Sequence, residues 1–112
     1  MEIIASDNLY ILKPYSPLLN KRESLRIFEK IKSLNITSIG LDLSLVEECT
    51  IDFLTDLKKI SDDVKIGVFN VQSDIFALFS FMKFDKNVEL YVNELDYRDT
   101  ERRLLIRRFN LV

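Results

Sequence analysis

The sequence predicts a single α/β domain with a mostly parallel sheet, and three observations lead to this prediction. Apolar runs of strand length alternate along the chain with helical segments. The chain has 112 residues, a usual length for one domain. Its residues are 47% hydrophobic and 30% charged, which is enough apolar material for a folded core. We expect the order β-β-α-β-α-β-α-β-α, with about five strands and about four helices in one domain spanning residues 1–112.

The N-terminal third of the chain is expected to form a hairpin and then a helix. Residues 3–5 and 9–12 are β-like runs around the turn-prone Ser6-Asp7-Asn8, which predicts a hairpin with a loop of these three residues. Helical spacing begins after Asn20, which has the offset of a capping box with Glu23. The helix that follows is expected to bury Leu25, Ile27, Phe28, Ile31 and Leu34.

The second half of the chain continues the alternation. Thr50 precedes a helix whose Phe53, Leu57 and Ile60 share one side. Gly67 lies inside an apolar run that reads as a buried strand. The full set of elements expected after the first helix is a strand at 39–43, a helix from 50, a strand at 64–69, a helix from 73, a strand at 88–92 and a helix at 97–109.

Missing residue types exclude several chemistries within this chain. There is no histidine and one cysteine, so neither a Ser-His-Asp triad, a Cys-His dyad nor a zinc site of the usual composition can be assembled. With two glycines, the chain contains neither GxGxxG nor a Walker phosphate loop. We therefore expect no enzymatic activity, no cofactor and no metal ion.

Charge and hydropathy indicate the cellular setting. The net charge of −2 gives no global nucleic-acid footprint, so we expect no nucleic-acid partner. The lone cysteine suits a reducing compartment, no leader opens the chain, and its apolar runs are too short to span a bilayer. These features predict a cytoplasmic protein without direct membrane insertion.

The C-terminal segment 97–112 is a basic helix in this interpretation. It has five arginines and two acidic residues, whereas the rest of the chain is net acidic. Such a segment can be a solvated helix with ion pairs along it. It could also pair with an acidic partner, or with the acidic face of a second copy in a homodimer.

One stretch carries a family resemblance. Residues 39–46 read IGLDLSLV and are followed by a helix with leucines at helical spacing. This stretch resembles the STAS domain, which occurs in anti-sigma-factor antagonists and in the cytoplasmic part of sulfate transporters. The family pattern is Asp-Leu-Ser-Gly-Val after a strand, then Asp-Ser-Ser-Gly-Leu at the start of a helix. Asp42-Leu43-Ser44 and Val46 match the first part, and Leu54 falls on the final leucine of the second.

The resemblance continues downstream and spans residues 36–95. Residues 65–70 are similar to the fourth-strand region of the family, and residues 72–82 to the helix after it. Phe84-Asp85-Lys86 is similar to a terminal Leu-Asp-Lys turn. The resemblance implies a bacterial protein and a STAS-like fold.

The chain departs from the family at its phosphorylation site. Ile51 stands where the phosphoacceptor serine would fall, and isoleucine has no hydroxyl. Thr50 replaces the preceding aspartate, Asp52 the following serine and Phe53 the glycine. The resemblance therefore implies a member that lacks the usual serine switch.

The resemblance implies a non-catalytic protein-interaction module that regulates transcription by binding an anti-sigma factor or a related regulator. An alternative is a STAS-like subunit of a membrane-associated transport or lipid-trafficking complex that binds an ATPase subunit. Docking would use the surface at the start of the second helix, with an aromatic anchor beside it. The residues expected to bind the partner are Ser44, Glu48, Thr50, Ile51, Asp52, Thr55 and Phe76.

Three interpretations of Thr50 and Asp52 stay open. Thr50 can be a helix N-cap, with Asp52 as a first-turn acid that complements the helix dipole. Asp52 can instead supply a permanent negative charge where relatives acquire a phosphate. Finally, Thr50 can itself be phosphorylated, since a helix N-terminus accommodates a phosphate.

Neighbouring residues also have alternatives. Glu47, Glu48, Asp52 and Asp56 form either a solvated acidic loop or a divalent-ion site. Cys49 reads as a small buried apolar residue, because the chain has no histidine to activate it.

The third helix is expected to dock through one apolar stripe. That stripe consists of Ile75, Leu78, Phe79 and Met82. Phe81 is expected to pack as well. Phe76 is either a surface anchor for a protein partner or covered by a neighbouring element.

Overall fold

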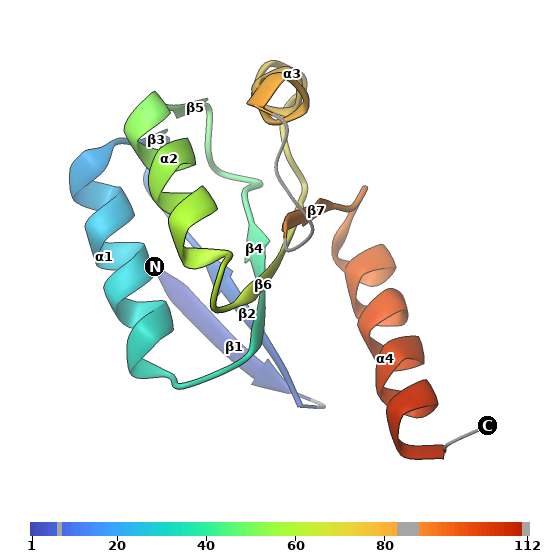
Figure 1. Cartoon of the computed structure of the whole chain (residues 1–112). Coiled ribbons are helices and arrows are strands. Elements are labelled where there is room, and N and C mark those ends of the chain that lie inside the picture. Colours follow the sequence, from blue (N-terminus) through green and yellow to red (C-terminus); the bar gives the residue numbers. More distant parts are fainter. Residues whose placement is uncertain (7, 83–87, 111–112) are drawn as a thin grey trace.

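Figure 1 shows the computed structural model, which describes residues 1–6, 8–82 and 88–110. Within these residues the chain forms seven strands and four helices. Their bounds in chain order are β1 (Glu2–Ser6), β2 (Leu9–Lys13), β3 (Leu18–Leu19), α1 (Lys21–Ser33), β4 (Ser38–Asp42), β5 (Glu48–Cys49), α2 (Ile51–Ile60), β6 (Lys65–Phe69), α3 (Ser73–Met82), β7 (Val88–Leu90) and α4 (Glu94–Asn110).

The main sheet has five strands in the order β1-β2-β4-β6-β7. β1 pairs with β2 antiparallel, and every other neighbouring pair is parallel. The predicted α/β class, the mostly parallel sheet and the order of its elements are confirmed. The hairpin connection is shorter than expected, because Ser6 pairs directly with Leu9.

Two very short strands were not expected. β3 and β5 pair in parallel as a separate two-stranded sheet, with Leu18 opposite Glu48 and Leu19 opposite Cys49. Two-residue strands leave no periodicity to detect in a sequence. They join the segment before α1 to the segment before α2.

The helices cover the sheet unequally. In Figure 1, α1 and α2 lie side by side on one face, α4 lies on the other, and α3 sits beyond the end of the sheet. The larger core lies between the sheet and the α1/α2 layer. It is formed by the buried residues Leu12, Leu19, Ile27, Phe28, Ile31, Ile39, Leu41, Leu43, Val46, Phe53, Leu54, Leu57, Ile60, Val64, Ile66, Val68, Ile75 and Phe79.

Helix α1 begins and ends as its sequence predicts. The Asn20 side chain accepts a hydrogen bond from the Glu23 backbone N–H at 3.1 Å, so Asn20 is the N-cap. Asn35, just after the helix, has a φ of 51°, the left-handed conformation that asparagine tolerates. The expectation that Leu25 is buried was wrong. Leu25 is exposed, because α1 turns Ser24 toward α2.

Helix α4 begins at Glu94, three residues before the expected start. The Asn93 side chain accepts a hydrogen bond from the Asp96 backbone N–H at 2.9 Å and acts as an N-terminal cap. Tyr97, in the first turn of α4, points toward the sheet and packs against Phe69 and Tyr91. Residues 111 and 112 of the predicted C-terminal helix lie outside the described residues.

Candidate functional site

The candidate site lies at the edge of the sheet where the parallel strands end. The connections that leave β2, β4, β6 and β7 at their carboxyl ends all emerge at this edge. Helices α2 and α3 begin there, as Figure 1 shows at the top of the molecule. In α/β proteins this edge is the usual location of binding sites. We call it the docking edge.

Asp42 organises the loop after β4. Its carboxylate is nearly buried and accepts hydrogen bonds from the Ser44 backbone N–H at 3.0 Å and from the Asn70 side-chain amide at 3.2 Å. Asn70, which follows β6, has a φ of 56°. The loop is thus tied to both strands, and Ser44 is left exposed on its outer surface.

Backbone hydrogen bonds hold the next segment in place. The carbonyl of Pro17 accepts from the N–H groups of Glu47 and Glu48, at 2.8 and 3.0 Å. The carbonyl of Leu19 accepts from the N–H of Thr50 at 2.9 Å. The start of α2 is therefore anchored to the segment that precedes α1, which gives the docking edge a fixed backbone.

Thr50 is the N-cap of α2. Its hydroxyl accepts from the Phe53 backbone N–H at 3.3 Å and donates to the Leu19 carbonyl at 3.2 Å. This geometry confirms the capping interpretation, with Asp52 as the acidic residue of the first turn. A phosphate on Thr50 would remove the donor that reaches Leu19.

The first turn of α2 points outward. Ile51 is 72% exposed, and Asp52 and Thr55 are exposed beside it. Ile51 and Thr55 are four residues apart and so share one face of the helix. The start of α2 therefore presents one large apolar side chain, Ile51, with polar side chains beside it.

Asp56 has a different role from the acids near it. Its carboxylate accepts from the Lys21 ammonium at 2.9 Å and from the Ser24 hydroxyl at 2.7 Å. The bond with Lys21, supported by Ser24, lowers the pKa of Asp56 below its ordinary value. Asp56 thus joins α2 to α1 and belongs to the structural framework.

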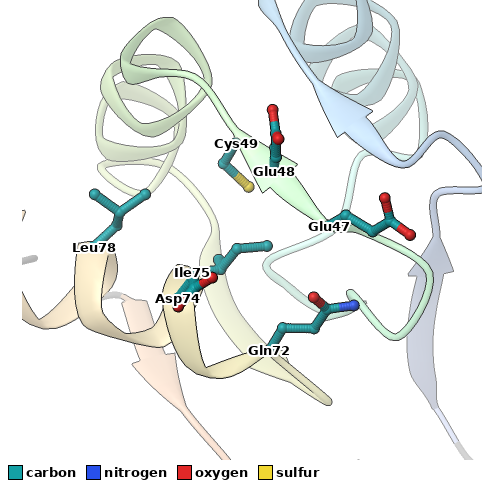
Figure 2. A pocket seen from close by; sticks show the side chains of 7 residues that line it. All are labelled: Glu47, Glu48, Cys49, Gln72, Asp74, Ile75 and Leu78. Atoms are coloured by element: carbon teal, nitrogen blue, oxygen red, sulfur yellow. The ribbon is translucent and has the colours of Figure 1, made fainter.

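A groove of about 500 Å³ separates the α2 entry segment from α3, as Figure 2 shows. Its walls carry the acidic side chains of Glu47, Glu48 and Asp74. Burial raises the pKa of the Cys49 thiol, which lines the groove, to about 12, so the thiol is protonated at neutral pH. The remaining lining residues are Gln72, Ile75 and Leu78.

Helix α3 exposes more apolar surface than predicted. Ile75 and Phe79 are buried as expected, but Leu78 is partly exposed. The prediction that Phe81 packs was wrong, since it is 83% exposed. It is exposed because α3 lies beyond the end of the sheet and only the Ile75 and Phe79 side faces the core.

The structure brings most of the predicted partner-binding residues to one edge. Six of them lie in the segment 44–55 and are exposed or partly exposed: Ser44, Glu48, Thr50, Ile51, Asp52 and Thr55. Phe76 is also exposed, but it lies on another flank of α3. It is two residues from the groove residue Leu78, which corresponds to about 160° around a helix.

Sequence reasoning missed most of the exposed apolar residues at this edge. Apolar side chains at helical or strand spacing read as core, so no signal marks one that is left uncovered. The residues missed are Tyr15, Leu18, Leu45, Leu78, Phe81, Val92 and Leu95.

The acidic residues do not assemble into a metal centre. Asp56 is held by α1, and Asp52 lies at the tip of α2. Across the described ranges, no group of three or more cysteine, aspartate or glutamate side chains is arranged to hold a metal ion. Asp56 is therefore engaged with α1 and separate from the exposed Asp52, and the solvated acidic loop stays a prediction.

The chain matches no protein-family model, and no curated protein matches it at a significant level. Phe84-Asp85-Lys86, part of the STAS resemblance, lies outside the described residues. None of the helices in the described part of the chain combines the length and the apolar character needed to cross a membrane.

Proposed function

We propose that this protein is a non-catalytic interaction module that binds a regulatory protein through its docking edge. The partner class is the one that the STAS resemblance implies, an anti-sigma factor or a related regulator of transcription. In this proposal Ser44, Ile51 and Thr55 contact the partner. The loop held by Asp42 presents Ser44, and the first turn of α2 presents Ile51 and Thr55.

The observation that carries the proposal is the distribution of exposed apolar side chains. Large groups of exposed apolar side chains on a soluble protein mark interaction sites, whereas single ones are ordinary. Among the described residues, the exposed large apolar side chains lie mostly in the connections and helices of the docking edge. These are Tyr15, Leu18, Leu45, Ile51, Phe76, Leu78, Phe81, Val92 and Leu95.

Acidic side chains at the docking edge favour a partner with a basic surface. Glu48, Asp52 and Asp74 are exposed there, and no lysine or arginine of the described residues lines the groove of Figure 2. Acidic groups around an apolar centre increase the association rate of a partner with basic groups. We therefore expect a partner surface with lysine or arginine around apolar side chains.

The position of the family phosphoserine is occupied by Ile51 in this chain. Ile51 has no hydroxyl, and the Thr50 hydroxyl is engaged in two hydrogen bonds of the helix cap. Binding would then depend on the amounts of the two proteins, with no phosphate turning it off at this edge. Intact-mass analysis of protein from its own cells, before and after phosphatase, tests this: a removable phosphate on Thr50 would contradict it.

The experiment for the proposed function is affinity capture from the protein's own cells with the wild-type chain and with Ile51→Arg. We expect a partner with a histidine-kinase-like ATP-binding domain to be captured by the wild type and lost with the variant. Thr37→Arg is the control, because Thr37 is exposed and precedes β4, at the opposite end of the sheet from the docking edge. Equal capture by all three chains would overturn the proposal.

The same experiment tests the alternative function. A STAS-like subunit of a transport or lipid-trafficking complex would capture an ATP-binding cassette subunit instead. The identity of the captured ATPase, read by mass spectrometry, therefore separates the two candidates.

A further inference from the structure

A second surface of the molecule is open, at the β1 edge of the sheet. β1 is the outermost strand and pairs with β2 over five consecutive residues without a bulge. Of its side chains, Ile3 alone is partly buried, and the other four are exposed. Tyr15 donates a hydrogen bond to Glu2, and Arg98 donates one to Ser6. These bonds engage side chains and leave the outer backbone edge of β1 without a strand partner in the described structure.

In β1 the usual protection of an edge strand against pairing is limited to one charged residue, Glu2, at its start. Natural edge strands are blocked by proline, bulges, short length or charged residues. β7, at the other edge, is three residues long and has Glu89 at its centre. β1 has five residues, no proline, and Ile4 at its centre. The two edges of this sheet therefore differ, and β1 is the one suited to pairing.

The surface continues from β1 onto the outer flank of α1. A shallow depression lies there, lined by Met1, Arg26, Glu29, Lys30 and Ser33. Figure 1 shows α1 and the N-terminus on the same side of the molecule. Among the described residues, the exposed large apolar side chains that are not at the docking edge are Met1, Ile4 and Leu25.

We propose that β1 pairs antiparallel with β1 of a second copy of this chain, which forms a two-fold dimer with one sheet continuous across both copies. The new backbone hydrogen bonds would use the open N–H and C=O groups of the edge. The outer flanks of the two α1 helices would then approach each other above the junction.

The sequence of β1 fits a copy of itself. A two-fold register centred on Ile4 places Ile4 opposite Ile4, Ile3 opposite Ala5, and Glu2 opposite Ser6. No like charges face each other in this register, and the central pair is apolar, which favours an antiparallel pair. Pairing β7 with its own copy about its centre would instead place Glu89 opposite Glu89.

The flank of α1 is compatible with the same symmetry. It carries both signs of charge, with Arg26 and Lys30 on either side of Glu29. In an isologous contact each residue meets the other copy's matching surface, so a flank with one sign of charge would repel itself. The mixed flank lets Glu29 of one copy face a basic side chain of the other.

The dimer would leave both docking edges free, because β1 is a lateral edge of the sheet and the docking edge is formed by strand ends. One dimer would then present two partner sites. Bivalent attachment to a dimeric partner raises the effective affinity without any new contact. The proposal does not depend on which protein binds the docking edge.

Cysteine cross-linking tests the register. In a Cys49→Ala background, Ile4→Cys places two thiols on opposed residues, with Cα atoms about 5 Å apart, within disulfide range. Ser6→Cys is the matched control on the same strand, because two such residues would lie about 14 Å apart along the paired strands. We expect Ile4→Cys to cross-link at least about tenfold faster than Ser6→Cys under mild oxidation.

Sedimentation equilibrium gives a second measurement without cysteine chemistry. We expect the wild-type chain and Ile51→Lys to show the same monomer–dimer equilibrium, and Ile4→Lys to shift it to monomer. Equal cross-linking of the two cysteine variants would overturn the proposal. A wild-type chain that stays monomeric would also overturn it. So would a monomer that increases in mass only when an unrelated peptide is added, because the edge would then bind another polypeptide and not a second copy. A dimer lost with Ile51→Lys and kept with Ile4→Lys would assign the contact to the docking edge and overturn it too.

Discussion

Gly40 on β4 lies directly opposite Gly67 on β6, and the ring of Tyr97 covers both. A Cβ atom at Gly40 would lie 2.6 Å from Cε2 of the tyrosine, and one at Gly67 would lie 2.6 Å from its Cδ1. Neither glycine has a positive φ, so the close approach of the ring explains both of them. The only two glycines of the chain thus leave a flat part of the sheet, the seat of Tyr97, on which the ring of this α4 residue packs.

Substitution at this seat is expected to destabilise the fold. Gly67→Ala should lower the free energy of unfolding by about 1–3 kcal/mol, because its methyl group overlaps the Tyr97 ring. Urea denaturation measures this. Adding Tyr97→Leu, which removes the ring, should make the double variant more stable than the sum of the two single changes predicts. Simple additivity would contradict the packing described.

The hydroxyl of Tyr97 is expected to be dispensable for stability. It is buried and has no hydrogen-bond partner within the described part of the chain. Removing an unsatisfied buried polar group avoids its desolvation cost, so Tyr97→Phe should raise the free energy of unfolding by up to about 1 kcal/mol. Tyr91→Phe is the control, because Tyr91 donates a hydrogen bond to Glu89 at 2.7 Å and gains nothing. A loss of stability in Tyr97→Phe would contradict this account.

Stability is expected to fall in alkaline solution. Burial raises the pKa of Tyr97 above its ordinary value near 10, so the folded state holds a proton that the unfolded state releases. Ionisation of Tyr97 therefore leaves stability unchanged below about pH 10 and lowers it as the pH rises further, because the unfolded state ionises first. Urea midpoints measured on both sides of that pH should decline for the wild type and less steeply for Tyr97→Phe. Identical slopes would contradict the prediction.

The ion pair between Lys21 of α1 and Asp56 of α2 is expected to be lost in acidic solution. The pKa of Asp56 is lowered mainly by Lys21, so its stabilisation is present above the ordinary value near 3.8 and lost as the pH falls through the folded-state pKa. Asp56→Asn should cost about 1 kcal/mol of unfolding free energy at neutral pH and little in strong acid. Thermal denaturation at both pH values checks this, with Asp63→Asn as an exposed control. A difference that is the same at both pH values would argue against the ion pair.

Charge reversal at the tip of α2 is expected to weaken partner binding. Asp52 is exposed in the first turn, so Asp52→Lys should reduce affinity for a basic partner about tenfold and leave the domain folded. Calorimetric titration of the captured partner measures the Kd, and circular dichroism verifies the fold. Asp63→Lys makes the same charge change at an exposed position beyond α2. An unchanged Kd for Asp52→Lys would remove Asp52 from the proposed site.

The order of the elements, the mixed sheet and the helix starts at Asn20 and Thr50 could all be predicted from the sequence. These features depend on local chemistry: apolar periodicity distinguishes strands from helices, and a side-chain oxygen before a helix satisfies its free N–H groups. The expectation that Ser44, Ile51 and Thr55 lie on a surface came from the STAS resemblance, and all three are exposed.

Which apolar side chains are covered depends on how the elements pack in three dimensions. Periodicity marks Leu25, Leu78 and Phe81 as apolar, but it cannot say whether a neighbouring element packs over them. The seat of Tyr97 on two glycines, and the ion pair from Asp56 to α1, join residues far apart in the chain. Such contacts exist once the sheet register and the helix layers are set, and no local pattern encodes them.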